Sequence, residues 1–209
     1  MDIKERILAQ ASELFMRYGI RSVSMDEIAK ALGISKKTIY QYFHNKAAIV
    51  YEVTLAHFEA EEQMQLELSK QAENALEELT LLIPYLIRSF KEIPTQLIFE
   101  LQKYYPKAWQ LFERHKQAFI LVKVRENLER GIREGLYRAN IPVELMARIR
   151  LAHIDAGLSQ ELFPPQEFDH GEVQLQMFEL YMYGIVSDKG RALLNTYMNK
   201  VPQQIGKKE

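Results

Sequence analysis

Apolar residues recur at steps of three and four along almost the whole chain, a spacing typical of helices that bury one face. The first such stripe consists of Ile3, Ile7, Ala11, Leu14, Phe15 and Tyr18. Gly19 follows it, where a helix would end. No long alternation of apolar and polar residues indicates a strand. The pattern predicts an all-α fold, with helices over residues 3–18, 25–32, 36–43, from 46 past 58, 74–91, 94–104, 106–134, 143–162, 172–186 and 189–200.

The composition excludes several classes of protein. The 209 residues contain no cysteine, so disulfides, cysteine-based zinc sites and thiol redox sensing are excluded. No run of 18 or more apolar residues is present, so we expect no membrane span. The N-terminus is charged and does not resemble a signal peptide. We therefore expect a cytoplasmic protein, and no motif calls for a cofactor.

The charge of the chain is unevenly distributed. The formal net charge is −1, which alone argues against a nucleic-acid-binding protein. Residues 1–46, however, carry an excess of basic side chains, and the segment from Lys36 to Lys46 contains lysines and no acid. A local basic surface of this kind is typical of a protein face that contacts phosphates.

Residues 25–43 have the pattern of two short helices joined by a tight turn. Ser24 and Glu27 have the spacing of a capping box, in which a hydroxyl is followed by a carboxylate three residues later. Gly33 stands where the turn needs a left-handed backbone. Each helix contributes an apolar pair four residues apart, Ile28 with Leu32 and Ile39 with Phe43. The segment is therefore predicted to be a helix-turn-helix.

The second of these helices has a defined outer face. At 100° per residue, Lys37 and Gln41 lie opposite the apolar Ile39, and Thr38 and Tyr40 flank them. These side chains offer an ammonium, an amide, a hydroxyl and a phenol without any carboxylate, which suits the base edges and phosphates of a DNA major groove. The alternative is a surface helix that is merely polar.

The run MDEIAKALGISKKTIYQYFHNK, residues 25–46, resembles the signature of the TetR family of regulators. Together with the first helix, the resemblance covers about a quarter of the chain. It implies a three-helix DNA-binding domain, here residues 1–46, followed by a larger helical ligand-binding and dimerisation domain, residues 47–209. It further implies a one-component transcriptional regulator, most commonly a repressor, that binds a palindromic operator as a homodimer and is released by a small-molecule effector.

By position, the resemblance implies that a set of polar residues contacts DNA: Ser24, Lys36, Lys37, Thr38, Tyr40, Tyr42 and Lys46. Gln41 is added because of its outward angle and is not singled out by the resemblance. We expect Lys37, Thr38 and Gln41 to face base edges, and the other residues to hold phosphates.

The second half of the chain is rich in aromatic residues that are candidates for an effector pocket. We expect this pocket to include Tyr104, Tyr105, Trp109, Phe119 and His153. Arg150, on the same predicted helix as His153, is an alternative polar anchor. Packing in the core, or exposure of the polar groups to solvent or a partner, is the competing interpretation. The identity of the effector does not follow from the sequence.

The helices predicted over residues 143–162 and 172–186 correspond by position to the pair that dimerises in TetR-like proteins. The expected interface consists of Leu151, Ile154, Leu158, Phe178, Tyr181, Met182 and Ile185. The alternative is that these residues are buried within one chain.

Two other functional classes remain as alternatives. An enzyme is disfavoured because the five histidines show no metal-ligand spacing and the chain lacks a nucleophile elbow, a P-loop and a dinucleotide-binding motif. A helical adaptor without DNA binding would lack both a salt-dependent affinity for DNA and its loss in Lys37→Ala or Tyr40→Ala.

Overall fold

The fold is built from helices, as the sequence predicts. The computed structural model describes residues 2–200, apart from the side chains of Phe90 and Lys91; Met1 and residues 201–209, the end of the predicted second domain, lie outside the described residues. The helices are α1 (Ile3–Tyr18), α2 (Met25–Leu32), α3 (Lys36–Tyr42), α4 (Lys46–Gln71), α5 (Ala75–Glu92), α6 (Thr95–Tyr104), α7 (Pro106–His115), the π-helix η1 (Lys116–Ile120), α8 (Leu121–Arg133), α9 (Val143–Gly157), α10 (His170–Ile185) and α11 (Asp188–Met198). Within residues 2–200 the only β-pairing is an isolated antiparallel bridge between Tyr137 and Val186. The prediction of an all-α fold is confirmed.

The chain forms two compact units. The first unit comprises Met1–Glu62 and Glu92–His115, and the second comprises Gln63–Lys91 and Lys116–Glu209. Helix α4 therefore belongs to both units, and α6 and α7 belong to the unit that contains α1, α2 and α3. The domain boundary expected at residue 46 stays a prediction.

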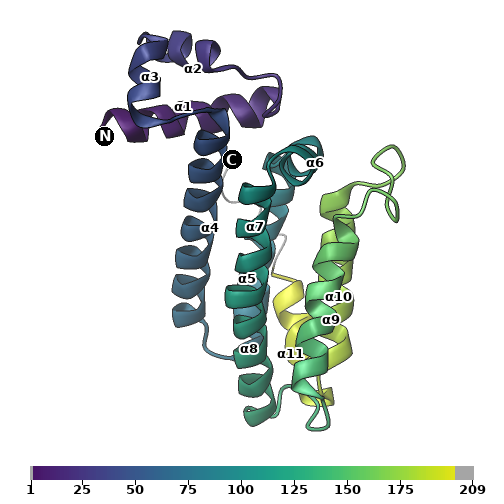
Figure 1. The fold of residues 1–209 in the computed structure, drawn as a ribbon. Coiled ribbons are helices and arrows are strands. Elements are labelled where there is room, and N and C mark those ends of the chain that lie inside the picture. The colour runs from purple at the N-terminus through teal and green to yellow at the C-terminus, as the bar shows by residue number, and fades with distance from the viewer. Residues whose placement is uncertain (1, 201–209) are drawn as a thin grey trace. The chain divides into compact units, whose positions relative to one another are not determined.

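The core of the first unit explains how α1, α2 and α3 are held together. In Figure 1 the short helices α2 and α3 lie across α1. Their buried apolar side chains join those of α4, α6 and α7 in one cluster: Ile7, Ala11, Phe15, Ile20, Val23, Met25, Ile28, Ala29, Ile39, Phe43, Ile49, Val50, Leu101 and Ala108. Burial of this cluster is the main source of stability of the unit, because apolar surface leaves water.

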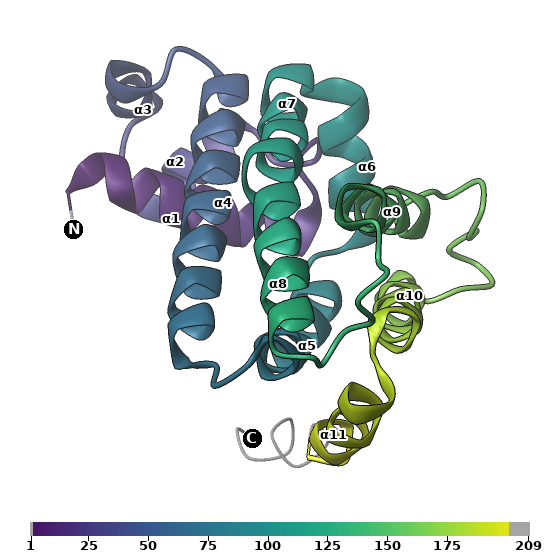
Figure 2. The same cartoon turned by 90° about the horizontal axis from the view of Figure 1, so that it is seen from below.

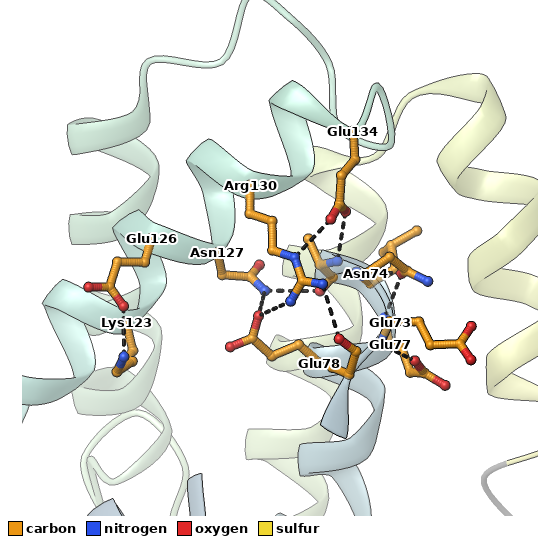
Figure 3. A network of polar contacts seen from close by, with 12 residues as sticks. Glu73, Asn74, Glu77, Glu78, Lys123, Glu126, Asn127, Arg130 and Glu134 are labelled. Carbon is orange, nitrogen blue, oxygen red and sulfur yellow. Dashed lines mark hydrogen bonds and ion pairs between the residues drawn. The ribbon is translucent and has the colours of Figure 1, made fainter. Parts of the chain in front are cut away.

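The second unit has its own apolar core and a polar network beside it. The network joins α8 to the beginning of α5 (Figure 3). Asn127 donates from Nδ2 to the Ala75 carbonyl at 2.9 Å and to Glu78 Oε2 at 3.0 Å. Arg130 donates from Nε to Glu134 Oε1 at 2.8 Å and from Nη2 to the Ala72 carbonyl at 3.0 Å. These bonds attach α8 to the end of α4 and to the beginning of α5.

The loop after α8, predicted over residues 135–142, is partly buried. The Tyr137 side chain is almost fully buried, and its hydroxyl donates to Asn127 Oδ1 at 2.8 Å. A Cβ atom on Gly131 would lie 2.1 Å from the Tyr137 ring, which is far closer than packing allows. A glycine at this position of α8 therefore gives the tyrosine ring room to enter the core.

Two of the predicted helices differ from those of the structure by more than shifts of one or two residues at their ends. The helix predicted over residues 106–134 is divided by the π-helical turn η1, in which the buried Lys116 forms an ion pair with Asp155. The helix predicted over 143–162 ends at Gly157 instead. There the Leu158 and Ser159 N–H groups donate to carbonyls only three residues back, those of Asp155 and Ala156, so the backbone tightens into turns.

Helices α9 and α10 lie side by side in the second unit (Figure 2). Their packing is close at Gly157, where an added Cβ would lie 2.4 Å from the amide nitrogen of Gln174. The Gln174 amide donates to the Ile154 carbonyl at 2.8 Å, which satisfies one of the last carbonyls of α9. The two helices therefore form one well-packed pair.

Candidate nucleic-acid interface

The beginning of α2 is fixed by the capping box that the sequence predicts. Ser24 Oγ accepts from the Glu27 N–H at 3.2 Å, and the Ser24 N–H donates to Glu27 Oε2 at 2.6 Å. The hydrogen bond from the Ser24 N–H lowers the pKa of Glu27, so this carboxylate is ionised at neutral pH. Ser24 remains exposed beside the N-terminus of α2, where its predicted contact with a phosphate stays a prediction.

The turn between α2 and α3 has the geometry that its sequence requires. Gly33 has a left-handed backbone with φ of 65°, and its N–H donates to the Lys30 carbonyl at 3.2 Å. Ser35 then caps α3, since its Oγ accepts from the Thr38 N–H at 3.0 Å. The two helices are thus joined by a short, hydrogen-bonded turn, which confirms the predicted helix-turn-helix.

Burial determines which face of α3 points outward. Ile39 is completely buried, and Phe43, directly after the helix, is nearly so. Lys37 and Gln41, on the opposite side of the helix, are both exposed. In the structure, Ile39 therefore points inward and Lys37 and Gln41 point outward, as the sequence predicts.

The exposed face of α3 carries donors and no carboxylate. Lys36, Lys37, Tyr40, Gln41 and Tyr42 are exposed on it or at its end. Thr38 is half-buried, and its hydroxyl lies 2.8 Å from that of Ser35. Thr38 is therefore partly occupied in capping the helix, while the other five residues of this face are accessible.

The two lysines at the start of α3 differ in their contacts. Lys36 Nζ lies 2.9 Å from Asp26 Oδ2 on α2, and this hydrogen bond raises the pKa of Lys36. Both side chains are well exposed, so such a pair contributes little to stability and can exchange its partner. Among the described residues Lys37 forms no ion pair, and its ammonium is available to another molecule.

Lys46, a predicted phosphate contact, is directed into its own unit. Its ammonium donates to the carbonyls of Ile20 at 2.9 Å and Val23 at 2.8 Å, and more weakly to that of Arg21. Burial lowers the pKa of Lys46. This side chain therefore holds the loop between α1 and α2, and a contact with phosphate would require it to leave these carbonyls.

A contribution of α6 to this unit was missed by the sequence analysis. Glu100 is buried, and its Oε2 accepts from the Arg21 N–H at 2.9 Å. The Arg21 guanidinium lies over the Tyr104 ring, 4.5 Å from its centroid, and donates to the Tyr104 hydroxyl at 3.2 Å. The loop before the helix-turn-helix is thus bound to α6. No local signal in the sequence joins residues so far apart.

The residues predicted to line an effector pocket are divided between the two units. Tyr105 and Trp109 pack against the core of the first unit, and Tyr104 is partly exposed beside Arg21. Phe119 and His153 belong to the second unit. Neither unit by itself brings all five residues together, so a common pocket stays a prediction.

Most residues predicted for the dimer interface lie inside the second unit. Leu151, Phe178, Tyr181, Met182 and Ile185 belong to its buried core. Only Ile154 and Leu158 are half-buried, and Leu158 lies just beyond the end of α9. Burial within one chain is the alternative that the sequence left open, and these five residues fit it, whereas the interface itself stays a prediction.

Two classes of site are absent from the part of the chain that the structure describes. No group of three or more histidine, aspartate or glutamate side chains is arranged to hold a metal ion. Likewise, none of the helices between residues 2 and 200 has the length and apolar character needed to cross a membrane.

The segment that contains the helix-turn-helix is similar to a known protein family. Residues 7–53 match the family described as bacterial regulatory proteins, tetR family. The HTH-type transcriptional regulator YvaF of Bacillus subtilis is 28% identical over 191 residues, which cover 88% of this chain and 96% of that protein.

Solved structures share the fold over most of the chain. A transcriptional regulator from Saccharomonospora viridis in complex with choline aligns with a TM-score of 0.71 and 20% identity, over 88% of this chain and 97% of that one. The regulator FadR from Bacillus subtilis in complex with stearoyl-CoA aligns with a TM-score of 0.61 and 20% identity, over 87% of this chain and 98% of that one.

Proposed function

We propose that the chain is a DNA-binding transcriptional regulator of the tetR family that acts as a repressor and not as an enzyme, which the family match over residues 7–53 and the similarity to the regulator YvaF support. In this proposal a homodimer binds a palindromic operator, and a small-molecule effector releases it. Because an operator lies on the bacterial chromosome, the same proposal places the protein in the cytoplasm.

The observation that carries the proposal is the outer face of α3. Lys37 and Gln41 are exposed opposite the buried Ile39, and the helix contains no carboxylate. In the proposed complex Lys37 and Gln41 read base edges, because an ammonium and an amide match the acceptors of the major groove. Tyr40 and Lys36 contact phosphates, and Lys36 exchanges its partner Asp26 for the phosphate.

Further DNA contacts are proposed at the edges of this face. Ser24 lies at the N-terminus of α2, where backbone N–H groups favour a phosphate. Tyr42 is exposed at the end of α3. Thr38 reaches a base only if its hydroxyl turns from Ser35, and Lys46 is left out of the contact set because its ammonium is bound to carbonyls.

A dimer is proposed through the outward faces of α9 and α10. Leu180 on α10 is 68% exposed, and Val173, Met177 and Gly184 lie on the same side at steps of three and four. On α9 the corresponding exposed or half-buried residues are Leu145, Ile149, Ala152 and Ala156. Two copies of this helix pair would bury both stripes in a four-helix contact.

Regulation is proposed to act on the spacing of the two α3 helices. A dimer reads two half-sites on one DNA face when its recognition helices are about 34–36 Å apart. An effector that binds another conformer more tightly shifts the population away from this spacing. The two structural neighbours were solved with ligands as different as choline and stearoyl-CoA, so neither ligand is transferred to this chain.

Fluorescence anisotropy tests the proposal. Purified protein is titrated onto a labelled fragment of the DNA that flanks its gene, at two salt concentrations and against random competitor DNA. We expect specific binding whose affinity falls steeply with salt, since phosphate contacts release counterions. Tyr40→Ala should weaken binding, whereas Lys107→Ala, an exposed lysine on α7, should leave it unchanged.

If the protein does not bind the flanking fragment, its binding sequence is sought by selection from random DNA sequences. An enriched palindrome would support the proposal and identify the operator. If no sequence is enriched and the affinity does not depend on salt, the protein is not a DNA-binding repressor, and a helical adaptor becomes the better interpretation.

A further inference from the structure

The second unit contains a buried guanidinium with a nitrogen atom that has no hydrogen-bond partner among the described residues. Arg150 on α9 is only 7% exposed, and its Nη1 atom is buried with no hydrogen-bond partner among the described residues. The guanidinium lies over the Phe178 ring of α10, 4.8 Å from its centroid. The ring face attracts the positive charge but gives no acceptor to the N–H groups at the rim of the guanidinium. A charged donor left in this state is costly in the protein interior.

No acidic side chain of the described residues compensates this charge. Burial lowers the pKa of Arg150 to about 10, so the guanidinium is still charged at neutral pH. The group that acts to raise the pKa of Arg150 is the Tyr181 hydroxyl and not a carboxylate. Asp155, on the same helix, forms its ion pair with Lys116. Arg150 is therefore a buried positive charge with no carboxylate partner among the described residues.

Two uncharged polar groups lie beside Arg150. His153 follows it by three residues on α9, and its Nδ1 atom is buried without a hydrogen-bond partner in residues 2–200. Burial, and secondarily the charge of Arg150, lowers the pKa of His153, so its ring is neutral at pH 7. Burial raises the pKa of Tyr181 although Arg150 opposes this, so its hydroxyl keeps its proton.

These groups belong to facing positions of two packed helices. Arg150 and His153 are one turn apart on α9, and Phe178 and Tyr181 are one turn apart on α10. They combine a fixed positive charge with neutral groups able to donate hydrogen bonds, in an apolar setting. A trapped water molecule would accept a hydrogen bond from Arg150 but would not neutralise it, whereas an anion does both.

We propose that Arg150 is the anchor of an effector site, and that the effector is an organic anion whose carboxylate or phosphate group binds this guanidinium while its apolar body contacts Phe178 and the surrounding core. This inference rests on the proposed function, because it names the chemical class of the effector that would release the repressor. Of the residues predicted for an effector pocket, His153 lies beside Arg150 within the second unit.

Thermal unfolding of the full-length protein tests the charge preference. The probes are alkyl and aryl carboxylates and phosphates of increasing size, each compared with the alcohol and the amine of the same carbon skeleton. We expect at least one anion to raise Tm above the effect of its matched alcohol and amine. Titration calorimetry with that anion should show affinity about tenfold or more lower in Arg150→Met, since a hydrogen-bonded charge is lost.

Matched variants separate a binding role from a structural one. Arg148→Met removes an exposed arginine of the same helix, which is paired with Glu144, and should leave anion binding unchanged. Arg150→Lys keeps the charge and should retain part of the preference. Without any ligand, Arg150→Met should melt about 2 to 4 °C higher than the natural protein, because an unpaired buried charge is replaced by an apolar chain of similar length.

The outcomes that test the anion site are distinct from those that test the proposed repressor. If no anion exceeds its matched alcohol, if Arg150→Met keeps the full preference, or if its ligand-free form melts lower, the anion site is refuted. Operator binding is measured separately for each variant. An anion that binds at Arg150 without changing operator affinity would refute its role as effector, and absence of DNA binding in the natural protein would refute the repressor alone.

Discussion

At the scale of single residues, neighbouring side chains of one type differ in what they can do. Lys36 is paired with Asp26, whereas Lys37 is exposed without an ion pair among the described residues. We predict that Lys37→Ala weakens operator binding by about 1–3 kcal/mol, because in the proposed complex the ammonium faces base edges directly. Lys36→Ala should have a smaller effect. Anisotropy titrations of both variants at two salt concentrations measure the difference.

The pair between Lys36 and Asp26 supplies the control. Asp26→Asn removes the competing carboxylate and should raise the affinity for any DNA, specific or random, since it frees one ammonium for phosphate. Equal losses in Lys36→Ala and Lys37→Ala, together with no gain in Asp26→Asn, would contradict the orientation that we give to α3.

His115 gives the first unit a dependence on pH. Its Nδ1 lies 2.9 Å from Glu62 Oε1, its Nε2 lies 3.7 Å from Glu61 Oε1, and its ring stacks on Phe58. Burial acts to lower the pKa of His115, but the hydrogen bonds with Glu61 and Glu62 outweigh it and raise the pKa. The protonated histidine is therefore favoured in the folded protein.

A raised pKa determines the sign of the effect on stability. The stabilisation by protonated His115 is fully present below its ordinary pKa of 6.5 and is lost as pH rises through the higher folded value. We predict that the free energy of unfolding falls over this window and that His115→Gln removes this decline. Urea unfolding at a series of pH values measures it. His44→Gln, at an exposed position, should keep the decline, and a decline that survives in His115→Gln would exclude this histidine as its source.

At the scale of elements, one glycine of α8 controls how the following loop packs. Gly131→Ala should destabilise the protein by about 1 to 3 kcal/mol, because the added Cβ would lie 2.1 Å from the buried Tyr137 ring. Gly184→Ala in α10 is the control, measured in the Leu180→Glu background because Gly184 lies on the proposed dimer face; within one chain its Cβ would meet nothing within 4 Å. There the better helix propensity of alanine should stabilise the protein by up to about 1 kcal/mol. Chemical unfolding compares the two; equal effects would mean that Tyr137 can move aside.

The elements that the sequence predicts best are those whose limits are encoded locally. Ser24 caps α2, Gly33 ends it and Ser35 caps α3, each through bonds to residues within a few positions. The outward face of α3 also follows from spacing alone, since Ile39 must be buried. For this reason the helix-turn-helix and its exposed donors could be predicted without a structure.

What the sequence could not predict depends on contacts between distant residues. Glu100 accepts from Arg21, 79 positions away, and this bond joins α6 to the loop before α2 within the first unit. Lys46 donates to carbonyls of the loop before α2, although its sequence position and charge predict a contact with phosphate. Similarly, α10 is apolar on nearly every side, and periodicity could not tell its core face, which contains Met182, from its exposed face, which contains Leu180.

At the scale of the whole molecule, the exposed stripes of α9 and α10 have a consequence for assembly. Exposed apolar side chains that line up along two adjacent helices are typical of an interaction surface. The proposed dimer and the binding of two half-sites are linked, because a monomer can occupy only one half-site. A change that separates the subunits should therefore weaken operator binding without altering α3.

Leu180→Glu tests this link, because it places a charge in the centre of the α10 stripe, where Leu180 is 68% exposed. We predict that the variant sediments as a monomer in analytical ultracentrifugation, since burial of an unpaired carboxylate opposes association. Its operator affinity should fall by at least about tenfold, whereas its affinity for random DNA changes little. Leu162→Glu, in the loop after α9, is the control and should remain dimeric, because this exposed leucine lies outside both helices. If Leu180→Glu stays dimeric with full operator affinity, the subunits associate through another face, and the spacing of the two α3 helices is set elsewhere.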